Sequence, residues 1–444
     1  MSENKKDHNN EHKTTDHNAT EQGGAAQDAT EQGATEEGAT EQGATEKAAT
    51  EQGASEQRAK DMQGLGFSTR AVHAGQEFDP ITGAVIPPLH MSTTYHPHSV
   101  GNLRLGYDYS RGTNPTRDNW QEQIAALEGG AYGISFASGL GAEDAIIRSL
   151  LSPRDRIVMG NDVYGGTHRL IDKIHGPNGI RHTPVDMTDT AAAVQAIRED
   201  ATAMVWIETP SNPLMKIADI EALTAAGHEA GAIVVVDNTF ASPYLQSPLA
   251  LGADLVVHST TKYLGGHSDV VGGAVVTNSE ELADKVRFIQ FAAGNQSSPF
   301  DAYMTTRGAK TLAVRMERHC DNAEAVVKWL RGRKEVTKVL YPGLADHPGH
   351  HVAARQMKRF GGMVSFRLAG GADAARAVAE STELFRLAES LGGIESLMNY
   401  PAEMTHASVK GTELEVPDDL LRLSVGIEDA EDLIADLEQA FARL

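Results

Sequence analysis

The sequence contains a single cysteine, Cys320, in 444 residues. One thiol cannot form an internal disulfide, so we expect a protein of the reducing cytoplasm. Cys320 lies in the helical pattern MERHCDNAEAVVKWL. We therefore expect it to be a small buried side chain and not a nucleophile.

Long apolar runs and an excess of basic residues are also lacking. No stretch of about 18 apolar residues is present, which predicts that no helix spans a bilayer. Lys5 and Lys6 are not followed by an apolar segment, so we expect no secretory signal. The net charge of −22 gives no general attraction for nucleic acid or an anionic membrane, and we expect neither as a partner.

Residues 1–62 lack Val, Ile, Leu, Phe, Tyr and Trp altogether. The segment holds 14 acidic and 6 basic residues, and the unit Ala-Thr-Glu-Gln-Gly at 29–33 recurs with small changes every five residues. A segment without apolar side chains cannot offset the entropy lost on ordering. We therefore predict a disordered acidic repeat tail at 1–62.

From Leu65 onward, short apolar runs alternate with helical stretches. Such runs predict strands buried on both faces, and the alternation predicts an α/β fold with a mostly parallel central sheet. The expected strands are 133–136, 156–159, 204–207, 233–236 and 255–257, and the expected helices include 191–199 and 220–230.

The pattern changes near both ends of this globular part. Beyond about residue 320, longer helical patterns flank two further strands, which predicts a smaller α/β domain at 321–444 after a main domain at 116–320. Residues 63–115 are rich in Pro, Gly, His and Tyr and lack periodicity, so we expect an arm that packs against another surface.

Two of the expected strands end in polar clusters. One ends at Asp237, and the other ends at Ser259-Thr260-Thr261-Lys262. Ligands of parallel sheets bind at the carboxyl ends of strands. A lysine, a carboxylate and hydroxyls suit pyridoxal phosphate (PLP), which needs an amine, a partner for its ring nitrogen and phosphate ligands. On the residues alone, a turn-capping aspartate and a surface lysine remain equally open.

A third motif is the small-residue segment Ser138-Gly139-Leu140-Gly141, between a strand and a helical stretch. The backbone N–H groups at such a helix start can bind a phosphate. A dinucleotide site is the alternative, although Asp144 stands where its third glycine is expected.

Ten colinear passages resemble the PLP-dependent enzymes of cysteine and methionine metabolism, a family typified by cystathionine γ-synthase and cystathionine γ-lyase. They include YSRGTNPT (109–116), SGLGA (138–142), ETPSNP (208–213), VVDNTFASP (235–243), HSTTKYLGGHSDVVGG (258–273), AESLGGIESL (388–397) and RLSVGIED (422–429). The resemblance implies the fold of PLP-dependent transferases of fold type I, the class of aspartate aminotransferase. Residues 116–320 would then be the PLP-binding domain.

The resemblance also implies roles in cofactor binding. Lys262 would bond covalently to PLP and act as catalytic base, and Tyr164 would stack on the ring and assist proton transfer. Asp237 would meet the ring nitrogen, and Asn212 would lie near the phenolic oxygen. The implied phosphate ligands are Ser259, Thr261, Ser138, Gly139 and Leu140, with Tyr109 and Arg111 from a neighbouring subunit. The arm would therefore reach a partner, in a homo-oligomer that is at least a dimer and, in this family, usually a tetramer.

For the substrate, Arg422 matches the arginine that pairs with the carboxylate of an amino acid, a geometry that lysine does not copy. The implied substrate-binding residues are Arg422, Ser390, Glu389, Arg169 and Asn212. Glu389 resembles an acidic residue of γ-synthases and γ-lyases, whereas β-lyases tend to carry an aromatic residue there. Gly166 is not the cysteine typical of methionine γ-lyases. No motif predicts a metal site.

These features favour a cystathionine-type substrate. We expect γ-replacement of O-succinylhomoserine, or its acetyl analogue, by L-cysteine to give cystathionine in methionine biosynthesis. The alternative is γ-elimination of cystathionine to cysteine, 2-oxobutyrate and ammonia. More distant alternatives are an O-acylhomoserine sulfhydrylase and a non-catalytic binding protein of the same fold.

Overall fold

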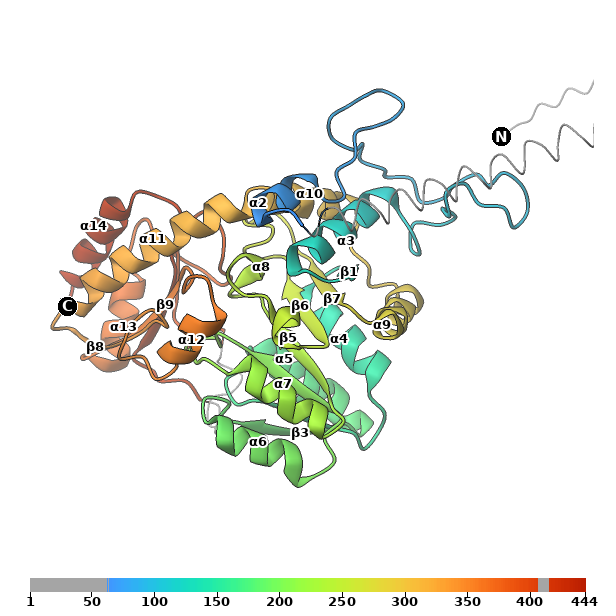
Figure 1. The fold of residues 1–444 in the computed structure, drawn as a ribbon. Helices are drawn as coiled ribbons and strands as arrows, with labels where there is room; N and C mark the ends of the chain where they lie inside the picture. The colour runs from blue at the N-terminus through green and yellow to red at the C-terminus, as the bar shows by residue number, and fades with distance from the viewer. Residues whose placement is uncertain (1–61, 63, 406–414) are drawn as a thin grey trace, which may run out of the picture. The chain divides into compact units, whose positions relative to one another are not determined.

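The computed structural model describes residues 62, 64–405 and 415–444, which Figure 1 shows as a coloured ribbon. The predicted acidic tail lies outside the described residues, apart from Met62. The described helices are α2 (Phe67–His73), α3 (Pro115–Glu128), α4 (Gly139–Leu150), α5 (Gly165–Arg169), η1 (Leu170–His175), η2 (Gly176–Asn178), α6 (Thr190–Glu199), α7 (Ile220–Glu229), α8 (Ser242–Leu245), η3 (Pro248–Leu251), α9 (Glu280–Ala293), α10 (Pro299–Ala309), α11 (Leu312–Arg331), α12 (His350–Gln356), α13 (Gly371–Ala379) and α14 (Ala430–Phe441). The described strands are β1 (Tyr132–Phe136), β2 (Arg156–Gly160), β3 (Arg181–Val185), β4 (Met204–Glu208), β5 (Ile233–Asp237), β6 (Leu255–Ser259), β7 (Gly273–Thr277), β8 (Val336–Leu340), β9 (Met363–Leu368), β10 (Arg386–Leu387), β11 (Leu397–Asn399) and β12 (Leu420–Ser424).

The central sheet has seven strands in the order β1-β7-β6-β5-β4-β2-β3. Strands β6, β5, β4, β2 and β3 are parallel to one another, and β7 runs antiparallel to its neighbours β6 and β1. The predicted mostly parallel sheet is therefore confirmed. All five strands that the apolar runs predicted are present, each one or two residues longer than expected.

Helices cover both faces of this sheet, which explains why its inner strands β4 and β5 are apolar up to their last residues, whereas the edge strand β3 is partly exposed and polar. Helices α4 and α9 pack on one face, together with Trp206, Val235 and Val257. On the other face α6 and α7 pack against β2, β4 and β5, and α3 packs near β6 and β7. A strand buried on both faces cannot alternate polar and apolar residues, so its sequence reads as a continuous apolar run.

The C-terminal part forms a second, five-stranded sheet in the order β10-β11-β12-β9-β8. Helices α11, α13 and α14 pack against it around Phe366, Leu421 and Leu437. Figure 1 shows α11 crossing from the central sheet to these orange and red elements. The predicted boundary at residue 320 thus falls inside a continuous helix, and Cys320 on that helix is buried as expected.

The arm at 64–114 contains α2 and isolated bridges, such as that between Thr94 and Tyr109. Several of its apolar side chains are exposed in the single chain, and those of Ile81 and Val85 are 91% and 85% exposed.

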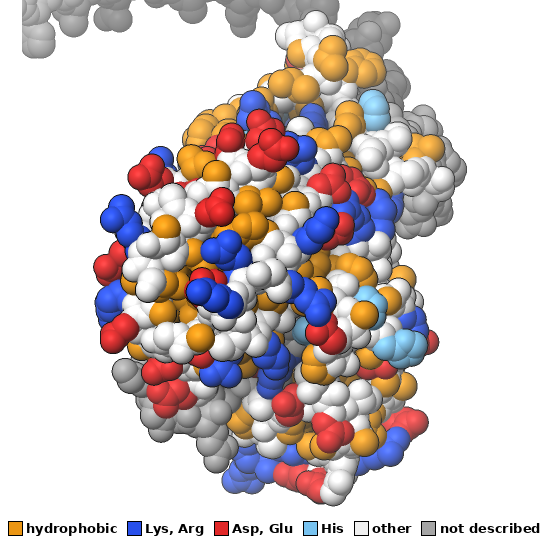
Figure 2. All heavy atoms as spheres, turned by 90° about the vertical axis from the view of Figure 1, so that its left-hand side faces the viewer, with side chains coloured by type: hydrophobic (Ala, Val, Ile, Leu, Met, Phe, Trp, Pro, Cys, Tyr) orange, Lys and Arg blue, Asp and Glu red, His pale blue; other side chains and the backbone are white. Residues whose placement is uncertain are grey.

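No described helix is long and apolar enough to cross a membrane. On the face shown in Figure 2, acidic and basic side chains are intermixed, so this face carries no extended basic patch.

Candidate active site

A cavity of about 310 Å³ lies at the carboxyl ends of the central strands. Glu208, Asp237 and Ser259 are the last residues of β4, β5 and β6, and all three line it. Its walls are Ser138, Gly139, Leu140, Glu143, Tyr164, Glu208, Asn212, Asp237, Thr239, Phe240, Ser259, Thr261, Lys262, Val271, Glu389, Ser390, Leu391, Thr405 and Arg422. The strand ends and the second sheet therefore build one cavity, as the parallel topology predicts.

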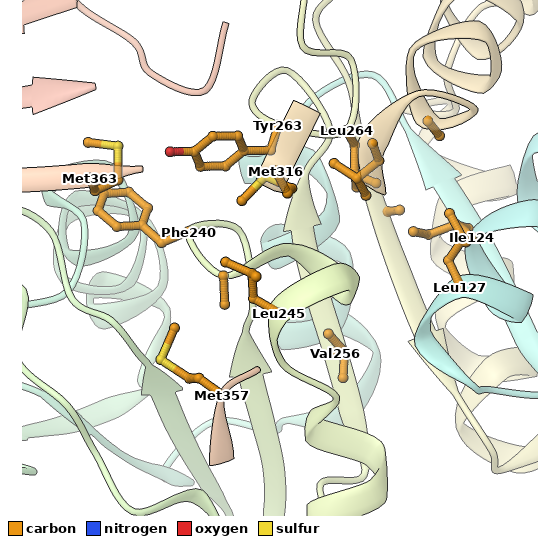
Figure 3. Packing of buried hydrophobic residues seen from close by; sticks show 14 of the residues in the cluster. Ile124, Leu127, Phe240, Leu245, Val256, Tyr263, Leu264, Met316, Met357 and Met363 are labelled. Carbon is orange, nitrogen blue, oxygen red and sulfur yellow. The ribbon is translucent and has the colours of Figure 1, made fainter. Parts of the chain in front are cut away.

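Lys262 is the primary amine of this cavity, and its Nζ donates a hydrogen bond to Oγ of Ser390 at 2.9 Å. Burial and the nearby charge of Arg422 lower the pKa of Lys262 to about 8, while Glu389 acts in the opposite direction. The next residue, Tyr263, is buried in the largest hydrophobic cluster, which also contains Met316 and Met363 (Figure 3). Packing of Tyr263 thus holds the backbone that carries Lys262.

Four carboxyl groups line the cavity. Three of them, those of Asp237, Glu208 and Glu143, come from the central sheet and α4, and that of Glu389 is the fourth. Asp237 Oδ1 accepts a hydrogen bond from the Thr239 backbone N–H at 2.9 Å. Glu208 Oε2 accepts one from the Tyr164 backbone N–H at 2.7 Å. Burial is the main cause that raises the pKa of all three, and the charge of Asp237 raises the pKa of both glutamates further. This is an environment that favours one negative charge over three.

The N-terminus of α4 also lines the cavity, through Ser138, Gly139 and Leu140. Ser138 caps the helix, since its Oγ accepts from the Gly141 backbone N–H at 3.0 Å. Gly139 lies so close to β6 that a Cβ there would be 2.8 Å from Cβ of Ser259. Free N–H groups of a first helical turn beside the hydroxyls of Ser259 and Thr261 form a suitable phosphate cradle.

Arg422 comes from β12 in the second sheet and is buried. Its guanidinium donates to Oδ1 of Asn212 at 2.7 Å and to the carbonyl oxygen of Ser390 at 2.9 Å. Burial lowers the pKa of Arg422 to about 10. Its Nε is buried without a hydrogen-bond partner in the described part of the chain, so this arginine retains a donor suited to an anionic ligand.

Of the predicted residues Tyr164, Glu389, Ser390 and Arg169, the first three line the cavity and Arg169 does not. Tyr164 lines the cavity, and a Cβ on Gly166 would lie 2.3 Å from its ring, so glycine is needed for this ring position. Glu389 and Ser390 also line the cavity, and Ser390 has a positive φ of 85°. Arg169, at the end of α5, is exposed and does not line the cavity.

Tyr109 and Arg111 do not line the cavity of their own chain. Arg111 Nη1 donates to the carbonyl oxygen of Phe291 at 3.0 Å, and its guanidinium lies 4.6 Å from the centre of the Phe291 ring. In the described residues, the arm thus holds both side chains away from the cavity.

The sequence reasoning missed several cavity residues, above all Glu143 and Glu208. Glu208 ends a predicted strand, as Asp237 does, so the rule about strand ends could have identified it. Glu143 had no such signal, because its position beside Asp237 depends on how α4 packs on the sheet. Among the residues that the structure describes, no group of three or more His, Cys, Asp or Glu is arranged to hold a metal ion.

The cavity fits PLP on chemical grounds. It combines an amine, buried carboxyl groups and a helix N-terminus whose close approach to β6 a Cβ on Gly139 would obstruct. Residues 68–442 match the family described as Cys/Met metabolism PLP-dependent enzymes. The chain belongs to this family of PLP-dependent enzymes, whose fold type I the structure shares.

Individual relatives differ in the reaction that they are named for. Cystathionine gamma-synthase of Mycobacterium tuberculosis is 55% identical over 375 residues, which cover 84% of this chain and 96% of that protein. Cystathionine gamma-lyase of Dictyostelium discoideum is 50% identical over 375 residues, with the same coverage. The crystal structure of cystathionine gamma synthase from Xanthomonas oryzae pv. oryzae in complex with cystathionine has a TM-score of 0.83 and 46% identity, covering 85% of this chain and 98% of that one.

Proposed function

We propose that this enzyme is a cystathionine γ-synthase, which replaces the acyloxy group at Cγ of O-succinylhomoserine or O-acetylhomoserine with the sulfur of L-cysteine and releases succinate or acetate. The observation that carries the substrate class is that one cavity is lined by Lys262, Arg422 and Glu389, and that the charges of Arg422 and Glu389 act in opposite directions on the pKa of Lys262. An amino acid with a carboxylate at one end and an amine at the other complements these charges. The choice of synthase over lyase is supported by 55% identity to a γ-synthase against 50% to a γ-lyase.

The proposed cofactor contacts follow the walls of the cavity. Lys262 would provide the amine that bonds to PLP, Asp237 would meet the ring nitrogen, Tyr164 would stack on the ring and Asn212 would lie near the phenolic oxygen. The phosphate would be held by Ser259, Thr261 and the start of α4 at Ser138, Gly139 and Leu140. Bound PLP withdraws electrons from the substrate's Cα, which makes the protons at Cα and then Cβ acidic.

This chain's residues then handle the substrate. Arg422 binds the α-carboxylate, and Ser390 orients Lys262 through the hydrogen bond to Nζ. Lys262, whose pKa burial lowers to about 8, accepts the Cα proton near neutral pH. Glu389 binds the distal amine of cystathionine, and Tyr164 assists proton transfer.

The reaction is tested by giving the purified enzyme O-succinylhomoserine with cysteine, and in parallel cystathionine alone. We expect cystathionine and succinate from the first mixture, with Lys262→Ala as the inactive control. Product from cystathionine alone, as cysteine and 2-oxobutyrate, would establish the γ-lyase instead. A third mixture, with sulfide in place of cysteine, detects an O-acylhomoserine sulfhydrylase.

We further propose that the active enzyme is a homo-oligomer in which the arm supplies Tyr109 and Arg111 to a neighbour's phosphate site. The exposed apolar side chains of the arm support this, because they need a surface to cover them. Subunits with Arg111→Ala and subunits with Lys262→Ala should each be inactive, yet regain activity when refolded together. In such a mixed dimer one site receives Lys262 from one subunit and Arg111 from the other. Absence of regained activity from two inactive variants would place Arg111 in its own chain's site, and an active Arg111→Ala enzyme would place it outside both sites. Arg169, which lies outside the cavity wall, keeps its proposed role at a distal substrate carboxylate.

A further inference from the structure

Glu208 and Glu143 line the cavity together with Asp237, and the roles proposed above use neither of them. Glu208 is paired in register with Asp237 at the ends of β4 and β5. Paired residues of neighbouring strands point to the same face of a sheet, so these two side chains are neighbours. Glu143 comes from α4, which covers that face, and lines the same cavity.

Glu143 differs from the other two in its hydrogen bonding. Glu208 and Asp237 each accept a backbone N–H, from Tyr164 and Thr239. Glu143 is 4% exposed, and the side chain of Thr167 lies close enough to act against the rise in its pKa, but in the part of the chain that the structure describes its Oε2 has no hydrogen-bond partner of good geometry. An unpaired buried carboxyl oxygen is costly, so a group in the cavity is the natural partner for it.

The charges around the cluster determine its protonation. One pyridinium N–H cannot compensate three buried carboxylates. Burial and the charge of Asp237 raise the pKa of Glu143 and of Glu208 well above the usual range. Burial also raises the pKa of Asp237, but hydrogen bonds from Thr239 and the charge of His258 oppose this. Asp237 is therefore the group that carries the charge, and Glu143 presents an O–H donor.

We propose that Glu143 is a positioning residue that acts as a neutral hydrogen-bond donor beside Asp237, and keeps the nitrogen end of the PLP site at a single negative charge. This inference rests on the proposed role of Asp237, but not on the choice between synthase and lyase. Helix α4 would then contribute twice to one site. Its first turn would bind the phosphate of PLP, and Glu143 in its second turn would lie at the ring nitrogen.

The test compares two neutral substitutions of similar size, Glu143→Gln and Glu143→Leu, because only glutamine retains a donor. For each holoenzyme the visible absorption of bound PLP is recorded, and the dissociation constant of PLP is measured by equilibrium dialysis. We expect Glu143→Gln to keep the wild-type band and bind PLP within about threefold of wild type, since its amide replaces the acid O–H. We expect Glu143→Leu to shift the band and to weaken PLP binding at least tenfold, from the loss of a buried donor.

Other patterns would overturn the proposal. Equal losses in both variants would mean that Glu143 acts as a carboxylate, and no loss in either would mean that it has no role. If Glu143→Leu does not fold, as judged by thermal unfolding of the apo-protein, the glutamine variant alone still decides, because a tenfold loss there contradicts a neutral donor. An Asp237→Asn variant with wild-type band and affinity would instead show that the proposed role of Asp237 is wrong.

Discussion

Gly139 offers a sharp test of the phosphate cradle, since its substitution should weaken PLP binding without unfolding the protein. In Gly139→Ala the new Cβ would lie 2.8 Å from Cβ and 3.0 Å from Cα of Ser259. Neither of these atoms can move by a change of rotamer. Because carbon atoms pack best at about 3.5–4.0 Å, the first turn of α4 must retreat from β6 by roughly 0.7 Å or more.

The size of the effect follows from the contacts that this shift disturbs. A hydrogen bond to a charged group contributes about 1.5–3 kcal/mol, so loss of one phosphate contact should weaken PLP binding roughly 10- to 100-fold. Helix propensity acts in the other direction, because alanine is favoured over glycine in a helix by about 1 kcal/mol. A loss of affinity therefore reports the close contact and not a weaker helix.

The assay is titration of the apo-protein with PLP, followed by the change in visible absorption. Gly160→Ala is the matched control, because Gly160 also ends a central strand but a Cβ there would meet Val163 at an ordinary 3.5 Å. Thermal unfolding of both apo-proteins checks that they fold. If Gly139→Ala binds PLP within twofold of wild type, the close approach of α4 to β6 does not form the cradle.

Further predictions concern the other walls of the cavity. The rate at which PLP attaches to the apo-protein should rise with pH and level off above about pH 8. The neutral amine of Lys262 is the reactive form, and burial lowers the pKa of this amine to about 8. A rate that still rises at pH 10 would contradict this. Arg422→Lys should lower kcat/KM by about 100-fold or more, mainly through KM, because lysine cannot keep both hydrogen bonds and still bind a carboxylate. Gly166→Ala should lower kcat at least tenfold, because the new Cβ would displace the ring of Tyr164. Tyr164→Phe keeps the ring in place and tests the hydroxyl alone. Equal absorption bands of bound PLP in wild type and Gly166→Ala would argue against displacement of the ring. Deletion of residues 1–61 should leave kcat and PLP affinity unchanged, because the described cavity is lined only by residues from 138 onward, and a large loss of either would assign the tail a role.

The sequence was informative about the site where its residues follow strands. The apolar runs that precede Asp237 and Ser259 identified two strand ends, and parallel topology then required both to lie at one edge of the sheet. The same reasoning extends to Glu208, which ends β4. It does not extend to Glu143 or Arg422, whose places depend on the packing of α4 and on how the second sheet docks.

The sequence by itself determined the class of fold, because strands buried on both faces must be apolar throughout and this pattern is local. Through its motifs it also identified the lysine, the aspartate and the family. Only the tertiary structure decided the electrostatics of the site. Whether Lys262 has a lowered pKa, whether Arg422 keeps an unpaired donor, and how many of three carboxyl groups can be charged all depend on burial and on neighbours distant in sequence. Those energies arise between elements that meet only after folding, so no pattern along the chain records them.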